Sequence, residues 1–225
     1  MPELPEVETV RRALHKYILG KELKEVCVRN PNLRWPVPTE QVNQFVVGQK
    51  VKSVDRRAKY ILVHLHNGHV LMLHLGMSGI MRIVTASEAL APHDHVIFSL
   101  GEHRELRFND ARRFGSIDVV HRESLDEHPR IKNLGVEPLS ADFTGHELFV
   151  SSRKLSVSVK NFLMNSRYVV GVGNIYACES LFRAGINPKR AAGKISQQRY
   201  LSLAQRVKET LSEAIAQGGT TLKDF

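Results

Sequence analysis

Residues 1–20 read MPELPEVETVRRALHKYILG and predict a helix that begins almost at the N-terminus. Pro5 suits the first helical turn, where its missing N–H costs no hydrogen bond, and Glu6 suits the positive end of the helix dipole. An apolar stripe with helical spacing then runs up to Gly20, which favours a helix end: Val7, Val10, Leu14 and Ile18. The start of the chain is therefore expected on a rigid element, although most N-termini are silent tails.

This placement matters because of the second residue. Removal of Met1 would leave the secondary amine of Pro2 at the terminus, beside the carboxylate of Glu3. A terminal amine is less basic than a lysine, so a much larger fraction of it is the free nucleophile at neutral pH. When a secondary amine attacks a carbonyl carbon it forms an iminium ion, which draws electrons from neighbouring bonds. Such an amine suits elimination chemistry at a masked aldehyde, for example C1′ of a deoxyribose.

The composition is that of a basic globular protein with room for two modest domains. The chain has 225 residues, 42% of them hydrophobic, and a formal net charge of +9. This charge indicates a polyanionic partner, and a merely soluble basic protein is the alternative. Cys27 and Cys178 form no CxxC pair and the eleven histidines form no HExxH pair, so no metal site is expected. The sequence fits a reducing cytosol, with no leader and no membrane-spanning run.

Strand patterns follow the first helix. Asn67-Gly68, between two apolar runs, is the strongest short-range hairpin signal. Another strand pair is expected around Gly101-Glu102. The expected strands cover residues 23–29, 51–54, 61–65, 70–75, 95–100 and 104–108. Residues 1–130 are therefore predicted to form an antiparallel β-domain with a helix at its front.

Helical periodicity replaces the strand pattern from about residue 135. The spacing predicts helices over 155–165, 174–184 and 197–217, and the polar stretch 120–135, which contains Pro129, is the expected linker. The chain is thus assigned to the α+β class, with residues 131–225 as a helical domain.

Three groups of residues suit DNA chemistry. In the first, Arg56-Arg57-Ala58-Lys59, three cations precede an apolar strand. These cations form a solvated face, or one of them points inward. In the second case, Lys59 would be a proton shuttle or phosphate anchor.

The second group consists of two loops, Leu75-Gly76-Met77-Ser78-Gly79 and residues 109–115, NDARRFG. A methionine at a loop tip usually fills a gap in packing. In a DNA-binding protein, Met77, Arg112 and Phe114 would instead form a wedge that fills the space left by a flipped base.

The third segment, residues 169–176, reads VVGVGNIY and opens a helix. It is a poor dinucleotide fingerprint, because the glycine spacing is incomplete and no βαβ unit surrounds it. We interpret it as a turn between helices, whose glycines let the backbone approach a phosphate, with Asn174 at the N-cap. Lys154 and Lys160 would add positive charge on the same face.

Together these segments resemble the family of formamidopyrimidine-DNA glycosylases, bacterial enzymes that excise 8-oxoguanine and ring-opened purines. The matching runs occur in family order along the whole chain, and the first and seventh are highly specific: MPELPEVETVRR, RRAKYILVHL, HLGMSG, HDHV, DARRFG, LGVEPLS, KNFLMNSRYVVGVGNIYACESLFRAGINP and GGTTLKDF. The resemblance implies an N-terminal β-sandwich with flanking helices and a C-terminal domain with a helix–two-turn–helix motif.

The resemblance also implies roles for individual residues. Pro2 would be the Schiff-base nucleophile, Glu3 the general acid at the deoxyribose, and Lys59 a proton donor and phosphate contact. Glu6 would line the base pocket. The void-filling trio would be Met77, Arg112 and Phe114, with Arg112 expected to recognise the opposing cytosine, and the DNA-holding positions would be His93, Arg112, Lys160 and Asn174.

The implied activity is that of a bifunctional glycosylase and AP lyase of base excision repair, which cleaves the strand by β,δ-elimination. The expected partner is double-stranded DNA with an oxidised purine, and the expected form is a monomer in the bacterial cytoplasm, at the nucleoid. Family members carry one structural zinc in a C-terminal finger with CxxC pairs, and this chain has no such cysteines. No cofactor is therefore expected in it.

Two alternatives stay open. One is an impaired or non-catalytic protein that binds damaged DNA without the finger. The other is an endonuclease VIII-like glycosylase for oxidised pyrimidines, although those enzymes have glycine where this chain has Leu4.

Overall fold

The structure, a computed structural model, describes residues 2–219 and divides into two compact units. The first contains Pro2 and Val7–His128. Of the described residues, the second contains Glu3–Glu6 together with residues 129–219. The sequence-based division placed all of residues 1–130 in one domain, whereas the contacts group the first helical turn with the helical unit. Residues 220–225 of the run GGTTLKDF lie outside the described part, as does Met1.

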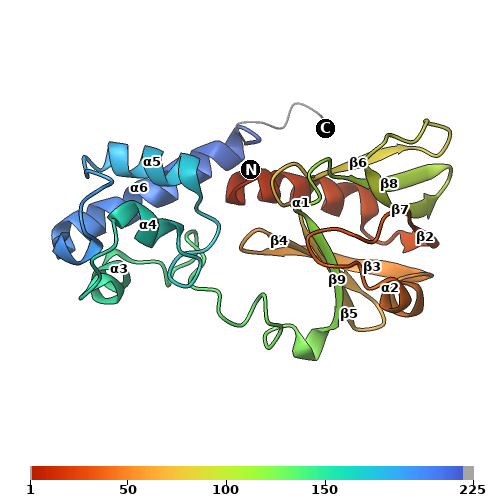
Figure 1. Cartoon of the computed structure of the whole chain (residues 1–225), viewed down its shortest axis with the longest axis horizontal. Helices are drawn as coiled ribbons and strands as arrows, with labels where there is room; N and C mark the ends of the chain where they lie inside the picture. The colour runs from red at the N-terminus through yellow and green to blue at the C-terminus, as the bar shows by residue number, and fades with distance from the viewer. Residues whose placement is uncertain (1, 220–225) are drawn as a thin grey trace. The chain divides into compact units, whose positions relative to one another are not determined.

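The first unit is built from two antiparallel sheets, which form its two β-layers, and the part of helix α1, Leu4–Ile18, that begins at Val7 (Figure 1). A short helix, α2, covers Thr39–Phe45, and a 3-10 turn covers Arg122–Ser124. One sheet has the order β1-β3-β4-β5-β9, formed by Glu22–Leu23, Gln49–Arg57, Tyr60–Leu65, His69–His74 and Ser116–His121. The other has the order β2-β7-β8-β6, formed by Glu25–Val28, Asp94–Gly101, Arg104–Asn109 and Ile80–Thr85.

The predicted hairpins are confirmed. Strands β4 and β5 pair in antiparallel register with Ile61 opposite Leu73, and Gly68 in the connecting turn has φ of +84°. Such a left-handed conformation favours glycine, which is why the Asn-Gly pair marks this turn. β7 and β8 are joined through Glu102 and His103, near the expected Gly101-Glu102 position.

The helix α1 buries the stripe that its spacing predicts. Leu4, Val7, Val10, Leu14 and Ile18 are all at most 1% exposed. The helix ends at Ile18, and Gly20 follows in the left-handed region. Because one side of α1 is fully buried along its length, its axis is fixed against its neighbours.

The second unit is helical. Its α-helices are α3, Gly145–Ser152, α4, Val159–Met164, α5, Asn174–Arg183, and α6, Gln197–Ala216, with a 3-10 turn at Ala192–Lys194. α6 packs against α3 and α5 over a continuous apolar core that includes Phe162 and Tyr200. The hydroxyls of Thr144, Ser158 and Ser196 cap α3, α4 and α6 by accepting a backbone N–H three residues on.

The helix expected over residues 155–165 is shorter than predicted. α4 begins only at Val159, because Ser158 is its N-cap, and Lys154 upstream has φ of +66°, outside the helical region. The elements α2, β6, β9 and α3 were not expected from the sequence.

Candidate active site

Glu3 is the most strongly held of the candidate residues. Its side chain is buried, with the residue only 2% exposed. Its carboxylate accepts hydrogen bonds from the backbone N–H groups of Gly173 at 2.8 Å, Ile175 at 2.9 Å and Tyr176 at 3.3 Å. These donors belong to the N-cap and first turn of α5, so the residue next to Pro2 is fixed by the helical unit.

Glu3 is held in this way because of the unpaired backbone N–H groups at the start of α5. The first N–H groups of a helix lack partners within it, and the helix dipole makes that end positive. Gly173 is the N-cap and has no side chain with which to accept a hydrogen bond. The carboxylate of Glu3 supplies the missing acceptor and the complementary charge.

This arrangement changes the interpretation of the glycine-rich segment. Asn174 is the first helical residue and exposed, not the N-cap, and the predicted N-cap position is therefore wrong. A Cβ at Gly171 would lie 2.7 Å from Leu4, and one at Gly173 would lie 2.4 Å from the Cδ of Glu3. The glycines let the backbone approach the N-terminal segment, where the sequence had suggested a phosphate.

Glu6 is joined to the same cluster. Its residue is 2% exposed, and one carboxylate oxygen accepts the backbone N–H of Glu3 at 2.9 Å. The other oxygen accepts the hydroxyl of Tyr176 at 2.6 Å. Tyr176 thus donates to both acidic residues, through its backbone and its side chain, and holds them in a defined relation.

Pro2 and Lys59 belong to the first unit and are both half-buried. Lys59 lies in the two-residue turn between β3 and β4, directly before Tyr60, and Ala58 beside it has φ of +54°. The sequence placed Lys59 at the entry of a strand. The structure places it in the tight turn directly before that strand, where the fixed backbone sets the direction of the side chain.

The wedge candidates come from two loops that are bound together. Met77 and Phe114 are each 41% exposed, and the guanidinium of Arg112 lies over the Phe114 ring, 4.8 Å from its centroid. Large apolar side chains exposed on a rigid loop are typical of a contact surface. They line a pocket of about 690 Å³ with these neighbours: Asn32, Leu33, Arg34, His74, Gly76 and Arg113.

Asp110 fastens the two loops. Its carboxylate is buried and accepts the hydroxyl of Ser78 at 2.5 Å and the N–H of Gly115 at 2.7 Å. The Ser78 oxygen in turn accepts the N–H of Arg112 at 3.2 Å. These hydrogen bonds therefore join the two loops that carry Met77, Arg112 and Phe114.

His93 is exposed, at the end of a loop that a buried charge network supports. The carboxylate of Asp94 accepts hydrogen bonds from the Ala91 N–H at 2.9 Å, from Asn109 at 2.8 Å and from Arg82 at 3.1 Å. Burial of Asp94 raises its pKa, but these hydrogen bonds outweigh burial and hold that pKa below its usual value. Asp94 is thus a stable anion beneath His93.

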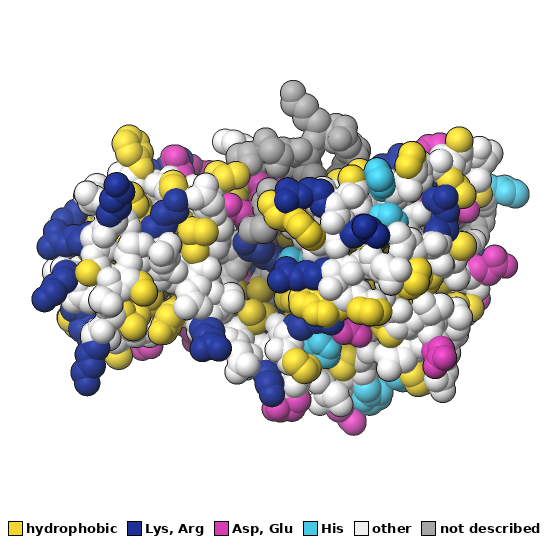
Figure 2. Space-filling model, viewed as in Figure 1, with side chains coloured by type: hydrophobic (Ala, Val, Ile, Leu, Met, Phe, Trp, Pro, Cys, Tyr) yellow, Lys and Arg dark blue, Asp and Glu magenta, His cyan; other side chains and the backbone are white. Residues whose placement is uncertain are grey.

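The remaining cationic candidates lie in the helical unit. Lys154 is exposed, and Lys160 is half-buried in the first turn of α4. Lys and Arg side chains are numerous on the face of this unit that Figure 2 shows. Of the candidates, the helical unit thus holds Glu3, Glu6, Lys154, Lys160 and Asn174, and the first unit holds Pro2, Lys59, Met77, His93, Arg112 and Phe114.

Sequence reasoning missed Tyr176, Asp110 and Ser78. Tyr176 stood in the quoted segment VVGVGNIY, but its hydroxyl had no evident acceptor within it. Asp110 and Ser78 lie in the two wedge loops, yet no local spacing indicates that a carboxylate from one loop accepts a hydroxyl from the other.

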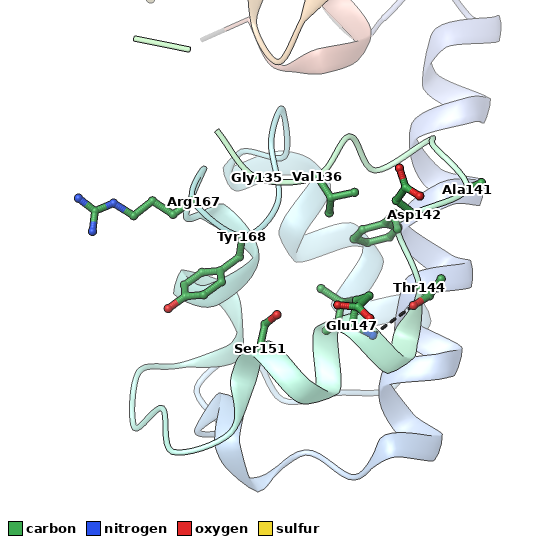
Figure 3. A pocket seen from close by; sticks show the side chains of 11 residues that line it. Gly135, Val136, Ala141, Asp142, Thr144, Glu147, Ser151, Arg167 and Tyr168 are labelled. Carbon is green, nitrogen blue, oxygen red and sulfur yellow. Dashed lines mark hydrogen bonds between the residues drawn. The ribbon is translucent and has the colours of Figure 1, made fainter. Parts of the chain in front are cut away.

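A cavity in the helical unit contains none of the candidates. It has a volume of about 530 Å³ and lies beside α3 (Figure 3). Thr144 caps α3 within it by accepting the Glu147 N–H, and Asp142, Ser151 and Tyr168 lie around it. It mixes apolar walls with acidic groups and carries no nucleophile beside a base.

No zinc site is formed by residues 2–219, since they contain no group of three or more potential His, Cys, Asp or Glu ligands. Cys27 and Cys178 are both exposed and unpaired with each other. Residues 2–219 therefore offer no ligand set for the structural zinc of the expected family. Across the same described stretch, no helix has both the length and the hydropathy to span a bilayer.

Comparison with known proteins decides the family. Residues 1–117 match the model of the formamidopyrimidine-DNA glycosylase N-terminal domain, and residues 134–225 match that of the H2TH domain of the same enzymes. The chain belongs to the formamidopyrimidine-DNA glycosylase family. The resemblance stated from the sequence motifs is thereby confirmed.

Relatives agree along the whole chain. Formamidopyrimidine-DNA glycosylases from Marinobacter nauticus and Stenotrophomonas maltophilia are each 52% identical over 225 residues, which is 100% of this chain and 82% of the relative. Among solved structures, the complex of the Lactococcus lactis enzyme with abasic-site DNA is 30% identical with a TM-score of 0.92. It covers 99% of this chain and 82% of that one. The α+β fold expected from the sequence is confirmed.

Proposed function

We propose that this protein is a bifunctional DNA glycosylase and AP lyase of base excision repair that removes oxidised purines. The observation that carries the proposal is the pair at the N-terminus. Pro2, a secondary amine once Met1 is removed, directly precedes a buried carboxylate held by three backbone N–H groups. A nucleophile beside a rigidly oriented acid–base group is the arrangement that covalent catalysis requires.

In the proposed reaction, the Pro2 nitrogen attacks C1′ of the damaged nucleotide. The C1′–N bond to the base breaks, and the base leaves with the bonding electrons and takes up a proton. Glu3 accepts the proton that the Pro2 nitrogen loses and delivers it to O4′ as the sugar ring opens. This yields an iminium ion between Pro2 and C1′.

The iminium ion then drives strand cleavage. It acidifies the C2′ proton, whose loss expels the 3′-phosphate, and a second elimination expels the 5′-phosphate. Lys59 is proposed to contact phosphate and to return protons during these steps, since an ammonium can serve as both acid and anchor. Glu6, held by Tyr176, would line the pocket for the extruded base.

The wedge and the cations are proposed to hold the DNA. Insertion of Met77, Arg112 and Phe114 would occupy the space of the flipped base and offset an unstacking cost of a few kcal/mol. The braced Ser78–Asp110–Gly115 connection supports this role because a wedge must resist the stacked bases. The proposed phosphate-binding positions are His93, Lys154, Lys160 and Asn174.

Several finer points are part of the proposal. The curated relatives named above are bacterial, which supports action in the bacterial cytoplasm, at the nucleoid, and the monomeric state stays a prediction. The preference for oxidised purines over oxidised pyrimidines also stays a prediction. One matching structure is a complex of the Lactococcus lactis enzyme with DNA that contains an oxidised pyrimidine. That observation supports oxidised pyrimidines as a second substrate class.

The decisive experiment is covalent trapping. The purified chain is mixed with a duplex carrying 8-oxoguanine opposite cytosine, borohydride is added, and adducts are sought on a denaturing gel. A reduced adduct is expected only where intact mass shows that Met1 is absent. DNA binding without any adduct would instead favour the non-catalytic alternative, and faster trapping on an oxidised pyrimidine would favour the endonuclease VIII-like one.

A further inference from the structure

A second concave site lies in the first unit, where β4 turns into β5. It has a volume of about 350 Å³ and combines cationic and imidazole side chains with a single carboxylate. Its lining residues are Lys52, Ser53, Asp55, His64, Leu65, His66, Gly68, His69 and Arg122. None of these residues has a role in the proposed catalysis, and we call this the hairpin pocket.

The hairpin pocket is separate from the catalytic candidates of its unit. Lys59 precedes the first residue of β4, and the pocket lies at the other end of that strand. The strand Tyr60–Leu65 has six residues. At about 3.3 Å per residue it spans roughly 20 Å, which is more than the reach of a lysine side chain.

Two cations of the hairpin pocket lack counter-ions. Within the described part of the chain, the side chains of Lys52 on β3 and Arg122 after β9 make no hydrogen bond and no ion pair. Other arginines of the unit are paired: Arg56 lies 3.2 Å from Glu8, and Arg82 lies 3.1 Å from Asp94. The positive charge of the pocket is therefore available to a ligand.

The pKa of His64 reflects the positive charge of Lys52 and Arg122. Burial lowers its pKa most, Asp55, 3.3 Å away, raises it, and Arg122 and Lys52 lower it further. The two cations are therefore close enough to His64 to oppose its protonation. Asp55 also accepts the Ser53 hydroxyl at 2.9 Å and its side chain is 60% exposed, so it offsets only part of their charge.

His69 adds an unsatisfied polar atom. Its ring stacks on Phe45 at 4.1 Å and meets the edge of His121 at 5.2 Å, and burial is the main cause that lowers its pKa. Its Nδ1 is buried without a hydrogen-bond partner among the described residues. A buried polar atom without a partner is costly, so the ring of His69 is held by its aromatic neighbours and not by a hydrogen bond at this nitrogen.

We propose that the hairpin pocket binds a phosphate group. A guanidinium presents a fork of donors that matches phosphate oxygens, and the ammonium of Lys52 adds a point charge. The imidazoles of His64 and His66 become donors when protonated. The phosphate belongs either to a small molecule, such as inorganic phosphate or a mononucleotide, or to DNA backbone remote from the lesion.

Binding is expected to depend on pH. The charged or titratable groups around His64 are Lys52, Asp55, His66, His69 and Arg122, with His121 and Glu123 just beyond them. A bound anion favours the protonated imidazole, so it raises the pKa of His64 and binding takes up protons. For a DNA phosphodiester, whose charge is constant between pH 6 and pH 8, affinity therefore increases as the pH falls. For inorganic phosphate and a mononucleotide, whose second ionisation has a pKa of about 6, the loss of ligand charge opposes this gain.

The test follows the imidazole resonances of His64 by NMR, assigned with His64→Gln, in the full chain. Inorganic phosphate, deoxyadenosine monophosphate and an undamaged duplex are titrated separately at constant ionic strength. The proposal expects a saturable shift of His64 and a raised pKa with at least one of these three probes. The tightest probe then identifies the source of the phosphate, and no shift with any of them would overturn the proposal.

A charge-matched pair of variants completes the test. Lys52→Ala with Arg122→Ala removes the two unpaired cations, which are exposed and are not part of a core. Lys24→Ala with Arg104→Ala removes the same charge from exposed positions outside the pocket. The first pair should weaken binding by at least about tenfold, as expected for lost charge-assisted hydrogen bonds. Equal weakening by both pairs would show a general charge effect and contradict a built site.

Discussion

The backbone N–H of Gly173 donates a hydrogen bond of 2.8 Å to the carboxylate of Glu3, which lies 170 positions earlier in the chain. A Cβ at position 173 would lie 2.4 Å from the Cδ of Glu3 and 2.5 Å from its Oε1. Any side chain at this position therefore displaces the carboxylate that the proposed nucleophile needs. The glycine is required by contact, since its φ is −117° and open to other residues.

Gly173→Ala is expected to impair catalysis more than folding. Overpacking of this kind costs about 1–3 kcal/mol of stability. A shift of Glu3 by about 1 Å would lower the rate of borohydride trapping roughly a hundredfold. Single-turnover trapping and urea unfolding measure the two effects. Cys178→Ala, on an exposed position of the same helix, is the control, and wild-type trapping by Gly173→Ala would contradict the assigned role of Glu3.

Tyr176→Phe is expected to destabilise the acidic cluster. The substitution removes the 2.6 Å hydrogen bond to the buried Glu6, and hydrogen bonds to charged groups contribute about 1.5–3 kcal/mol. The free energy of unfolding, measured in urea, should fall by about that amount. Tyr17→Phe removes a hydroxyl from a side chain that is 45% exposed and should leave stability unchanged. Equal effects of the two substitutions would show that the hydroxyl of Tyr176 is not specially placed.

Ser78→Ala is expected to loosen the wedge. It deletes the donor that joins the two loops and leaves the buried carboxylate of Asp110 with one partner fewer. Excision of 8-oxoguanine, which needs the base to be flipped, should slow about tenfold, whereas cleavage at a preformed abasic site should change much less. Ser87→Ala, at an exposed position in the connection between β6 and β7, serves as control. A uniform loss on both substrates would indicate general destabilisation.

Asp94→Asn is expected to change how stability depends on pH. The pKa of Asp94 is lowered in the folded state, so its ionised form stabilises the protein fully above about pH 4, and this contribution is lost as the pH falls through the lower folded pKa. The wild-type protein should thus exceed the variant in stability at pH 7 and lose that advantage towards pH 3. Urea unfolding across this range measures the difference. Asp126→Asn, at an exposed position, should show no such change, and a pH-independent gap for Asp94→Asn would refute the argument.

Much of the fold could be predicted because its signals are local. The stripe of α1 and the Asn67-Gly68 hairpin follow from spacing and turn chemistry alone. α3 also had a local signal, because Thr144 and Glu147 have the spacing of a capping box, and the Thr144 hydroxyl does accept the Glu147 N–H. β9 was not predicted, and only its last two residues fell in the expected linker, since its pairing with β5 gives no sign in its own six residues.

The buried faces of helices and the contacts between distant segments were harder to predict from the sequence. On α6, Leu201 is 45% exposed, whereas its neighbours Tyr200 and Leu203 are buried. The neighbours that select this face are α3 and α5, and no pattern within α6 identifies them. The contact of Glu3 with residues 173–176 joins segments about 170 positions apart, a distance at which one sequence carries no pairing signal.

This separation has a consequence for the newly made protein. Glu3 leaves the ribosome early, but the backbone N–H of Gly173 that holds it is made 170 residues later. At about 5–20 residues per second, this interval lasts roughly 9–35 seconds. Throughout it the reactive segment exists without its anchor. A chain interrupted before α5 would carry the proposed nucleophile without the backbone N–H groups that hold the carboxylate of Glu3 beside it.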